Sequence, residues 1–211
     1  YDDKGSEYFT ICIRRIADGT DLPDRLLDTG GSFGWSACGS YLFYIAVDEN
    51  HRPNRVLRHA LGSAQADDVC VYEEKDPGFF VGLSATTSGR FLIISAHDHE
   101  TAEAHLLDAH APLDAPTCVA PRETGIEYDV DDDAARDRLL IVTNWNGDSK
   151  AEDFQIVSAP IVKAHSDKAS WQVLRPHQPG CLVLEALAFR DHMAVLVREN
   201  ALPRMDIISW D

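Results

Sequence analysis

The sequence lacks the features that mark membrane and nucleotide-binding proteins. No apolar run approaches the roughly 20 residues that a membrane-spanning helix needs. It has no Gly-rich phosphate loop, no dinucleotide-binding fingerprint and no basic stripe with aromatic residues. The start, YDDKGSEYFT, is acidic and polar and so does not predict a signal peptide. Because the chain has no initiator Met, we expect it to be a fragment or a processed product.

Basic residues are few, since 19 Lys and Arg stand against 35 Asp and Glu, for a formal net charge of −16. Such a chain repels nucleic acids and anionic membranes and attracts cationic ligands. We therefore expect neither a nucleic-acid partner nor a membrane partner.

Cysteine is scarce and its spacing is wide, with no C-x-x-C pair. The five positions are Cys12, Cys38, Cys70, Cys118 and Cys181. An odd number at such spacing argues against a disulfide framework and against a structural zinc site. The pattern predicts a reducing, cytoplasmic location in which these cysteines are small buried side chains.

A 3.6-residue hydrophobic stripe longer than two turns is also missing, so almost no helix is predicted. Instead, short apolar runs rich in β-branched and aromatic residues lie between turn residues. FGWSACGSYLFY (33–44) aligns without a gap on LSATTSGRFLII (83–94), at an offset of 50 residues, and DRLLIV (137–142) and DHMAVL (191–196) continue the series. Each copy carries a first strand, a small-residue turn, a hydrophobic second strand, a polar tip, a third strand and a looser fourth strand.

Four antiparallel strands repeated about every 50 residues are typical of β-propeller blades. The sequence therefore predicts one all-β propeller domain over residues 1–211, with about four four-stranded blades plus a partial one. The approximate repeats are 1–30 (partial), 31–80, 81–125, 126–180 and 181–211 (partial). A closed ring of four or five blades is one alternative, but a start within a blade favours an arc of a larger ring. The open edges of an arc favour self-association.

The segments between the repeats are distinctive, and they follow one another over nearly the whole chain. They are DENHRPNRVLRHALGS (48–63), DDVCVYEEKDPGFFVG (67–82), SGRFLIISAHDHETAE (88–103), APRETGIEYDV (120–130), AEDFQIVSAP (151–160), WQVLRPHQPG (171–180) and RENALPRM (198–205). Together they resemble the oligopeptidase B (protease II) group of the prolyl oligopeptidase family of serine peptidases.

The resemblance implies a seven-bladed propeller joined to an α/β-hydrolase domain that carries a Ser–Asp–His triad. The propeller of that family restricts access to short peptides, and oligopeptidase B cuts after Arg and Lys. Only the middle part of the propeller has a counterpart here, so no catalytic residue can be carried onto this chain, and no cofactor or metal is implied. The resemblance implies a non-catalytic, substrate-gating part of such a peptidase. Its partners would be the hydrolase domain of the parent chain and short basic peptides.

Two alternatives remain: a free-standing propeller that binds a peptide or a protein, and a metal-dependent enzyme centred on His97 and His99. These two histidines have H-x-H spacing within SAHDHETAEAH (95–105). In the repeat this segment is the hairpin between the second and third strands, with a turn from Asp98 to Thr101. The two histidines then need not share a face, and a zinc site also needs further rigid ligands.

Three other motifs have a structural and a functional interpretation. GGSFG (30–34) matches G-x-S-x-G with Ser32 as nucleophile, but its setting reads as strand, turn, strand rather than strand, turn, helix. YDVDDDAARD (128–137) is the densest acidic run, but it lacks the calcium-loop pattern and is predicted to be a solvated turn. HRPNR (51–55) is a cationic hairpin tip that predicts solvated surface, the alternative being contact with a neighbouring domain or a peptide.

Overall fold

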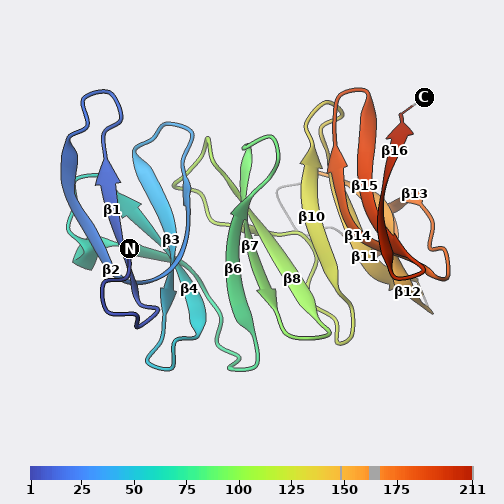
Figure 1. Ribbon diagram of the computed structural model, residues 1–211, viewed down its shortest axis with the longest axis horizontal. Coiled ribbons are helices and arrows are strands. Elements are labelled where there is room, and N and C mark those ends of the chain that lie inside the picture. The colour runs from blue at the N-terminus through green and yellow to red at the C-terminus, as the bar shows by residue number, and fades with distance from the viewer. Residues whose placement is uncertain (148, 162–166, 211) are drawn as a thin grey trace. The chain divides into compact units, whose positions relative to one another are not determined.

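The computed structural model describes residues 1–147, 149–161 and 167–210 of the chain. Within these residues the fold is four antiparallel β-sheets, which confirms the all-β prediction (Figure 1). The helical content of this part is two single 3₁₀ turns, η1 (Gln65–Asp67) and η2 (Lys168–Ser170). No helix in the described part is long and apolar enough to cross a membrane.

The first sheet has the order β1-β2-β3-β4-β5. Its strands are β1 (Phe9–Arg14), β2 (Asp21–Trp35), β3 (Tyr41–Val47), β4 (Pro53–Ala60) and β5 (Val69–Glu73). The first half of the long strand β2 pairs with β1, and its second half pairs with β3. The pairing shifts register between Thr29 and Phe33. Gly31 lies within this shift at a φ of +82°, a conformation that favours glycine.

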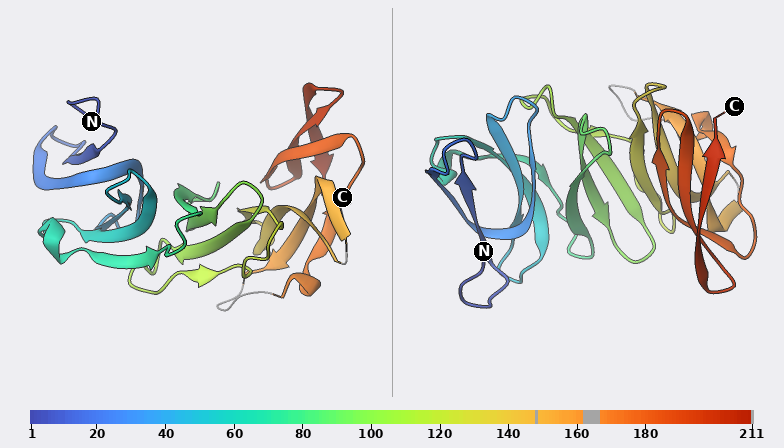
Figure 2. Two further views of the ribbon diagram at one scale, coloured as in Figure 1. Left: turned by 90° about the horizontal axis from the view of Figure 1, so that it is seen from below. Right: turned by 45° about the horizontal axis from the view of Figure 1, so that its top comes forward.

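The other three sheets are built from consecutive strands. They contain β6 (Phe80–Ala85), β7 (Phe91–His97), β8 (Ala102–Asp108) and β9 (Thr117–Cys118); β10 (Tyr128–Asp133), β11 (Arg138–Asn146), β12 (Ser149–Pro160) and β13 (Gln172–Arg175); and β14 (Cys181–Ala188), β15 (His192–Glu199) and β16 (Leu202–Ser209). Figure 2 shows these sheets from two further sides. The strand order follows the sequence in every sheet, as expected for hairpin-connected repeats. The repeat boundaries at 30/31, 80/81, 125/126 and 180/181 stay a prediction.

The chain divides into two compact units. The first is Tyr1–Ala85 with Arg90–Ala96 and Leu106–Pro116, and the second is Thr86–Gly89, His97–His105 and Thr117–Asp211.

The core of the first unit explains why β3, with the sequence YLFYIAV, is apolar throughout. Alternate residues of a strand point to opposite faces. Phe43 and Ile45 of β3 pack in a cluster with residues of β6 and β7, whereas Leu42 and Tyr44 pack in another cluster with Leu26 of β2. Both faces of β3 are therefore buried, and a strand buried on both faces needs apolar residues throughout.

The core of the second unit joins two sheets. Leu140 of β11 and Ile156 of β12 pack against Val183 of β14 and Val195 of β15. On β15 buried residues alternate with less buried ones, as in a strand with one face against a core. Burying each of these aliphatic side chains stabilises the fold by roughly 1.5–3 kcal/mol.

The prediction of buried cysteines is wrong for most of the five. All five are free thiols, but Cys12, Cys38 and Cys70 are exposed and Cys118 is half-buried. Cys181 alone is buried, in the core of the second unit. Cysteine is small enough to be tolerated on either face of a strand, so its identity does not determine its burial.

Candidate functional site

The G-x-S-x-G match at residues 30–34 is explained by packing. Ser32 is exposed within β2, and the next element is the strand β3, so the strand-to-helix turn of a nucleophile elbow is missing. A Cβ added at Gly30 would lie 3.0 Å from Cγ2 of Ile45, and one added at Gly34 would lie 2.6 Å from Cδ2 of Leu92. The glycines of the motif allow neighbouring strands to approach closely.

We expect Gly34→Ala to destabilise the fold and Ser32→Ala to leave its stability nearly unchanged. Gly34→Ala pushes a methyl group into buried Leu92, and such overpacking costs about 1–3 kcal/mol. Ser32→Ala changes an exposed side chain and is expected to alter the free energy of unfolding by less than about 0.5 kcal/mol. Urea denaturation of both variants measures the difference. A cost for Ser32→Ala equal to that for Gly34→Ala would contradict the packing explanation.

The hairpin of residues 95–105 has the turn that its sequence predicts. His97 is the last residue of β7, and the Asp98 carboxylate accepts hydrogen bonds from the backbone amides of Glu100 (2.8 Å) and Thr101 (2.7 Å). These amides hold the pKa of Asp98 below its ordinary value. His97 and His99 are both exposed, one at a strand end and one in the turn.

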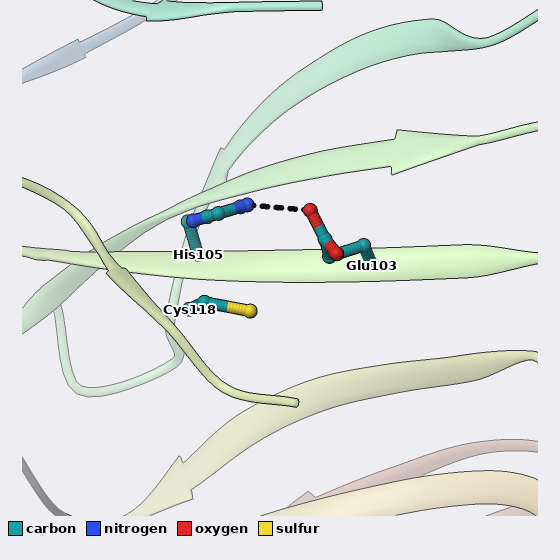
Figure 3. A group of neighbouring side chains, drawn as sticks. All are labelled: Glu103, His105 and Cys118. Carbon is teal, nitrogen blue, oxygen red and sulfur yellow. Dashed lines mark hydrogen bonds and ion pairs between the residues drawn. The ribbon is translucent and has the colours of Figure 1, made fainter. Parts of the chain in front are cut away.

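The ligating side chains that do come together are Glu103, His105 and Cys118 (Figure 3). Glu103 and His105 are two residues apart on β8, so they share a face of the strand. The Val119 amide donates to the Ala104 carbonyl (2.8 Å), which brings Cys118 beside His105. One ligand atom from each of the three side chains lies within 4.8 Å of the other two. All three residues are half-buried.

Protonation within this cluster is set by its own contacts. His105 Nε2 lies 2.9 Å from Glu103 Oε1, and the Arg122 amide donates to Glu103 Oε2 (2.8 Å). The hydrogen bond to His105 is the main cause that lowers the pKa of Glu103 to about 2, so this carboxylate is ionised at neutral pH. Burial, with the nearby Glu103 charge, raises the pKa of the Cys118 thiol to about 11.

A second polar cluster is fully buried in the first unit. His59 of β4 lies between two carboxylates, with Nε2 3.0 Å from Asp24 and Nδ1 2.7 Å from Asp68. Asp24 also accepts from the Gly62 amide, and Asp68 accepts from the Tyr44 hydroxyl (2.8 Å). Because both ring nitrogens face carboxylates, the hydrogen bonds outweigh burial and raise the pKa of His59. The cluster is closed to solvent, so we interpret it as structural.

The prediction of a solvated turn for residues 128–137 is correct for the turn itself and wrong for the acids before it. Residues 134–137 form an exposed turn, but the preceding acids lie on β10. Asp131 accepts from the Thr87 hydroxyl (2.6 Å) and Asp132 from the Ser88 hydroxyl (2.6 Å). Asp133 is buried and lies 3.0 Å from Nε of Arg138. Hydroxyl donors and an arginine from neighbouring strands and turns engage these acids, a tertiary effect that the local sequence does not show.

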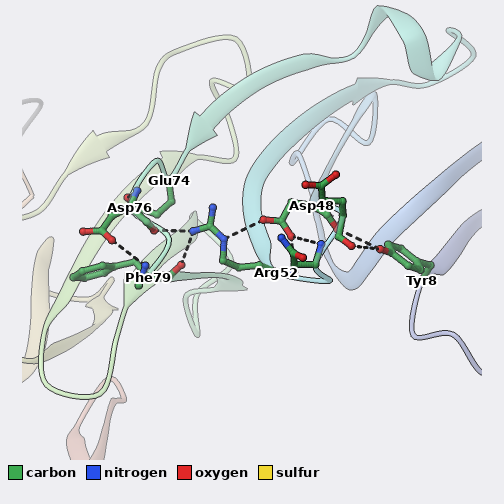
Figure 4. A network of polar contacts seen from close by, with 9 residues as sticks. Tyr8, Asp48, Arg52, Glu74, Asp76 and Phe79 are labelled. Atoms are coloured by element: carbon green, nitrogen blue, oxygen red, sulfur yellow. Dashed lines mark hydrogen bonds and ion pairs between the residues drawn. The ribbon is translucent and has the colours of Figure 1, made fainter.

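Arg52 of the tip HRPNR also departs from the solvated surface that the sequence predicts (Figure 4). Its side chain is only 15% exposed and pairs with Asp48 (3.2 Å). Its Nη1 donates to the backbone carbonyls of Asp76 (2.7 Å) and Phe79 (3.1 Å), which lie before β6. The guanidinium therefore holds the entry to the next sheet, because its several donors can satisfy carbonyls that a loop leaves unpaired.

The whole chain, residues 1–211, matches the family described as prolyl oligopeptidase, N-terminal beta-propeller domain. The chain belongs to this family and has the propeller fold of its N-terminal domain. The resemblance found in the sequence is thereby confirmed.

Named relatives agree with this assignment. Protease 2 of Moraxella lacunata is 34% identical over 98% of this chain and 30% of its own length. Dipeptidyl aminopeptidase BI of Pseudoxanthomonas mexicana is 31% identical over 100% of this chain and 28% of its own length. The chain thus spans less than a third of these relatives, which are peptidases by name.

Solved structures give the same result. Oligopeptidase B from Leishmania major superposes with a TM-score of 0.86 at 32% identity, over 97% of this chain and 28% of that protein. Oligopeptidase B from Trypanosoma brucei, with covalently bound antipain in a closed form, superposes with a TM-score of 0.81 at 29% identity. The match covers 97% of this chain and 28% of that protein.

Sequence reasoning missed both polar clusters. The E-x-H spacing of Glu103 and His105 on a predicted strand was the available signal for the first, since such residues share a face. Cys118 follows a loop whose path the sequence does not determine. The second cluster joins Asp24, His59 and Asp68, which no local pattern connects.

Proposed function

We propose that this chain is the non-catalytic, substrate-gating part of an oligopeptidase-B-like serine endopeptidase that cleaves short peptides after Arg or Lys. The observation that carries the proposal is the match of residues 1–211 to the propeller domain of the prolyl oligopeptidase family. The 34% identity to Protease 2 supports the assignment to the oligopeptidase B (protease II) group within that family.

In this proposal the propeller selects peptides, and a separate hydrolase domain cleaves them. The described strands have no nucleophile elbow at Ser32, so the triad is proposed to lie on an α/β-hydrolase domain elsewhere in the protein. There a serine attacks the scissile carbonyl, with a histidine as base and an aspartate orienting it. The propeller filters peptides by size, and its net charge of −16 attracts basic peptides over a long range.

The test is an assay of the protein expressed from its complete reading frame. Two fluorogenic peptides are compared that differ only in Arg or Glu before the scissile bond. We expect kcat/KM to favour Arg by at least about 100-fold and to fall with ionic strength, because steering by charge is screened by salt. An unfolded protein that carries the same cleavage sequence is expected to be cut at least about tenfold more slowly than the peptide, because a gate excludes long chains.

Each element of the proposal has its own contradicting result. Equal rates for the Arg and Glu peptides would contradict the specificity, and equal rates for peptide and unfolded protein would contradict the gate. A protein that is not labelled by a serine-directed phosphonate would point instead to a free-standing binding module. Ser32→Ala is the matched control and is expected to keep full activity, since Ser32 is an exposed strand residue.

A further inference from the structure

We propose that Glu103, His105 and Cys118 form a binding site for a borderline transition-metal ion, with Zn²⁺ as the preferred ion. The site is distinct from the H-x-H pair of the same hairpin, because His97 and His99 are exposed and do not join this cluster. It is also independent of the proposed peptidase activity, since it lies wholly within the propeller chain.

The spacing of the ligand atoms suits a tetrahedral ion. Bond lengths of about 2.0–2.3 Å place two tetrahedral ligands roughly 3.5 Å apart. Glu103 Oε1 and His105 Nε2 are 2.9 Å apart, and all three ligand atoms lie within 4.8 Å of one another. Side-chain rotations that move the ligand atoms by about 1 Å therefore complete the geometry without a change in the strands.

Binding exchanges protons for the metal ion. The ion takes the place of the hydrogen bond between Glu103 and His105 and binds the Nε2 lone pair of a neutral imidazole, while any proton on Nε2 moves to Nδ1 or to solvent. Cys118 loses its thiol proton to solvent and binds as the thiolate. Two anionic ligands then balance the charge of a divalent ion.

The three ligand types select the metal. A carboxylate, an imidazole and a thiolate together are a donor set that Zn²⁺ accepts, whereas Mg²⁺ and Ca²⁺ require oxygen ligands. Three protein ligands leave a fourth tetrahedral position for water or another donor. The hydrogen bond from the Arg122 amide to Glu103 Oε2 fixes the orientation of the carboxylate, as contacts around metal sites do. The Arg122 guanidinium, 3.6 Å from Glu103 Oε1, is the cation that the metal must displace.

The ion would join β8 to β9. Strand β9 has only two residues, so few ladder hydrogen bonds hold it. An ion bound by Glu103 and His105 on β8 and by Cys118 on β9 links them and stabilises the folded state by mass action.

The test uses the protein from its complete reading frame, freed of metal by a chelator that is then removed. Co²⁺ is added as a spectroscopic probe, and Zn²⁺ is titrated by calorimetry. We expect one ion per chain, a thiolate-to-cobalt charge-transfer band that Zn²⁺ abolishes, and a higher Tm with Zn²⁺ but not with Mg²⁺. Cys118→Ser, His105→Gln and Glu103→Gln are each expected to weaken Zn²⁺ binding at least about tenfold.

Exposed thiols provide the control. Cys12, Cys38 and Cys70 are exposed, so a variant with all three changed to Ser is expected to keep the band and the Zn²⁺ affinity. Loss of both in that variant would show adventitious binding by surface thiols and overturn the site. The wild-type spectrum needs no variant to fold, and the absence of a thiolate-to-cobalt band in it would also overturn the site.

Discussion

Replacing His59 by Ala is expected to destabilise the first unit by about 3–5 kcal/mol, because two buried carboxylates then lose the imidazole that bridges them. His59 is 0% exposed, and its ring bridges Asp24 and Asp68. Chemical denaturation followed by tryptophan fluorescence measures the change in the free energy of unfolding. The matched control is His110→Ala on an exposed turn, which is expected to change it by less than about 0.5 kcal/mol.

The pH dependence of this cost separates a charge cluster from simple packing. The pKa of His59 is raised above 6.5, so its contribution is full below pH 6.5 and is lost as the pH rises through the folded-state value. The pKa of Asp24 is lowered below 3.8 because hydrogen bonds from His59 and Gly62 outweigh burial. Its contribution is present above pH 3.8 and is lost as the pH falls. The cost of His59→Ala should therefore be greatest between pH 3.8 and 6.5, and a cost that is constant with pH would contradict the charge cluster.

Replacing Tyr128 by Phe is expected to destabilise the second unit by about 2–4 kcal/mol, although it removes a single oxygen atom. The Tyr128 hydroxyl accepts from the amides of Ala104 (2.8 Å) and Ala120 (3.3 Å) and donates to the Ala120 carbonyl (2.6 Å). All three residues are buried. Phe keeps the ring but leaves these backbone groups without the hydroxyl, and an unsatisfied buried polar group costs about 1–3 kcal/mol.

The control for Tyr128 is Tyr41→Phe. In the part of the chain that the structure describes, the Tyr41 hydroxyl makes no hydrogen bond, and Phe keeps a ring for the Arg58 guanidinium 5.8 Å away. A cost below about 0.5 kcal/mol is expected for this variant. Both variants are compared by urea denaturation. An equal effect of the two would mean that the Tyr128 hydroxyl does not stabilise the backbone of Ala104 and Ala120.

Patterns that are local in sequence predicted the strands well. The hydrophobic second strands predicted for the first two repeats formed as β3, which is buried on both faces, and as β7. The Asp98 turn also formed as predicted, because an Asp side chain can bond the amides two and three residues on. Each of these features depends on residues within one hairpin.

Contacts between distant segments were not predictable in the same way. Asp131 and Asp132 looked like a solvated acidic run, but hydroxyls of Thr87 and Ser88, 44 residues earlier, engage them. Arg52 looked like a solvated tip, but it binds carbonyls more than 20 residues later in the chain. A charged side chain is exposed or buried according to the partners that the fold brings to it.

The sequence by itself determined the all-β repeat and the family. The alternation of apolar and polar residues, the turn residues and the order of the distinctive segments can all be read along the chain without knowledge of its three-dimensional path. Tertiary structure alone decided which polar groups meet. It placed His59 between two carboxylates, set the Tyr128 hydroxyl against three backbone groups, and brought Cys118 beside Glu103 and His105. The physical reason is that hydrogen bonds and metal ligation require contact within a few ångströms. That proximity depends on the paths of whole strands and loops.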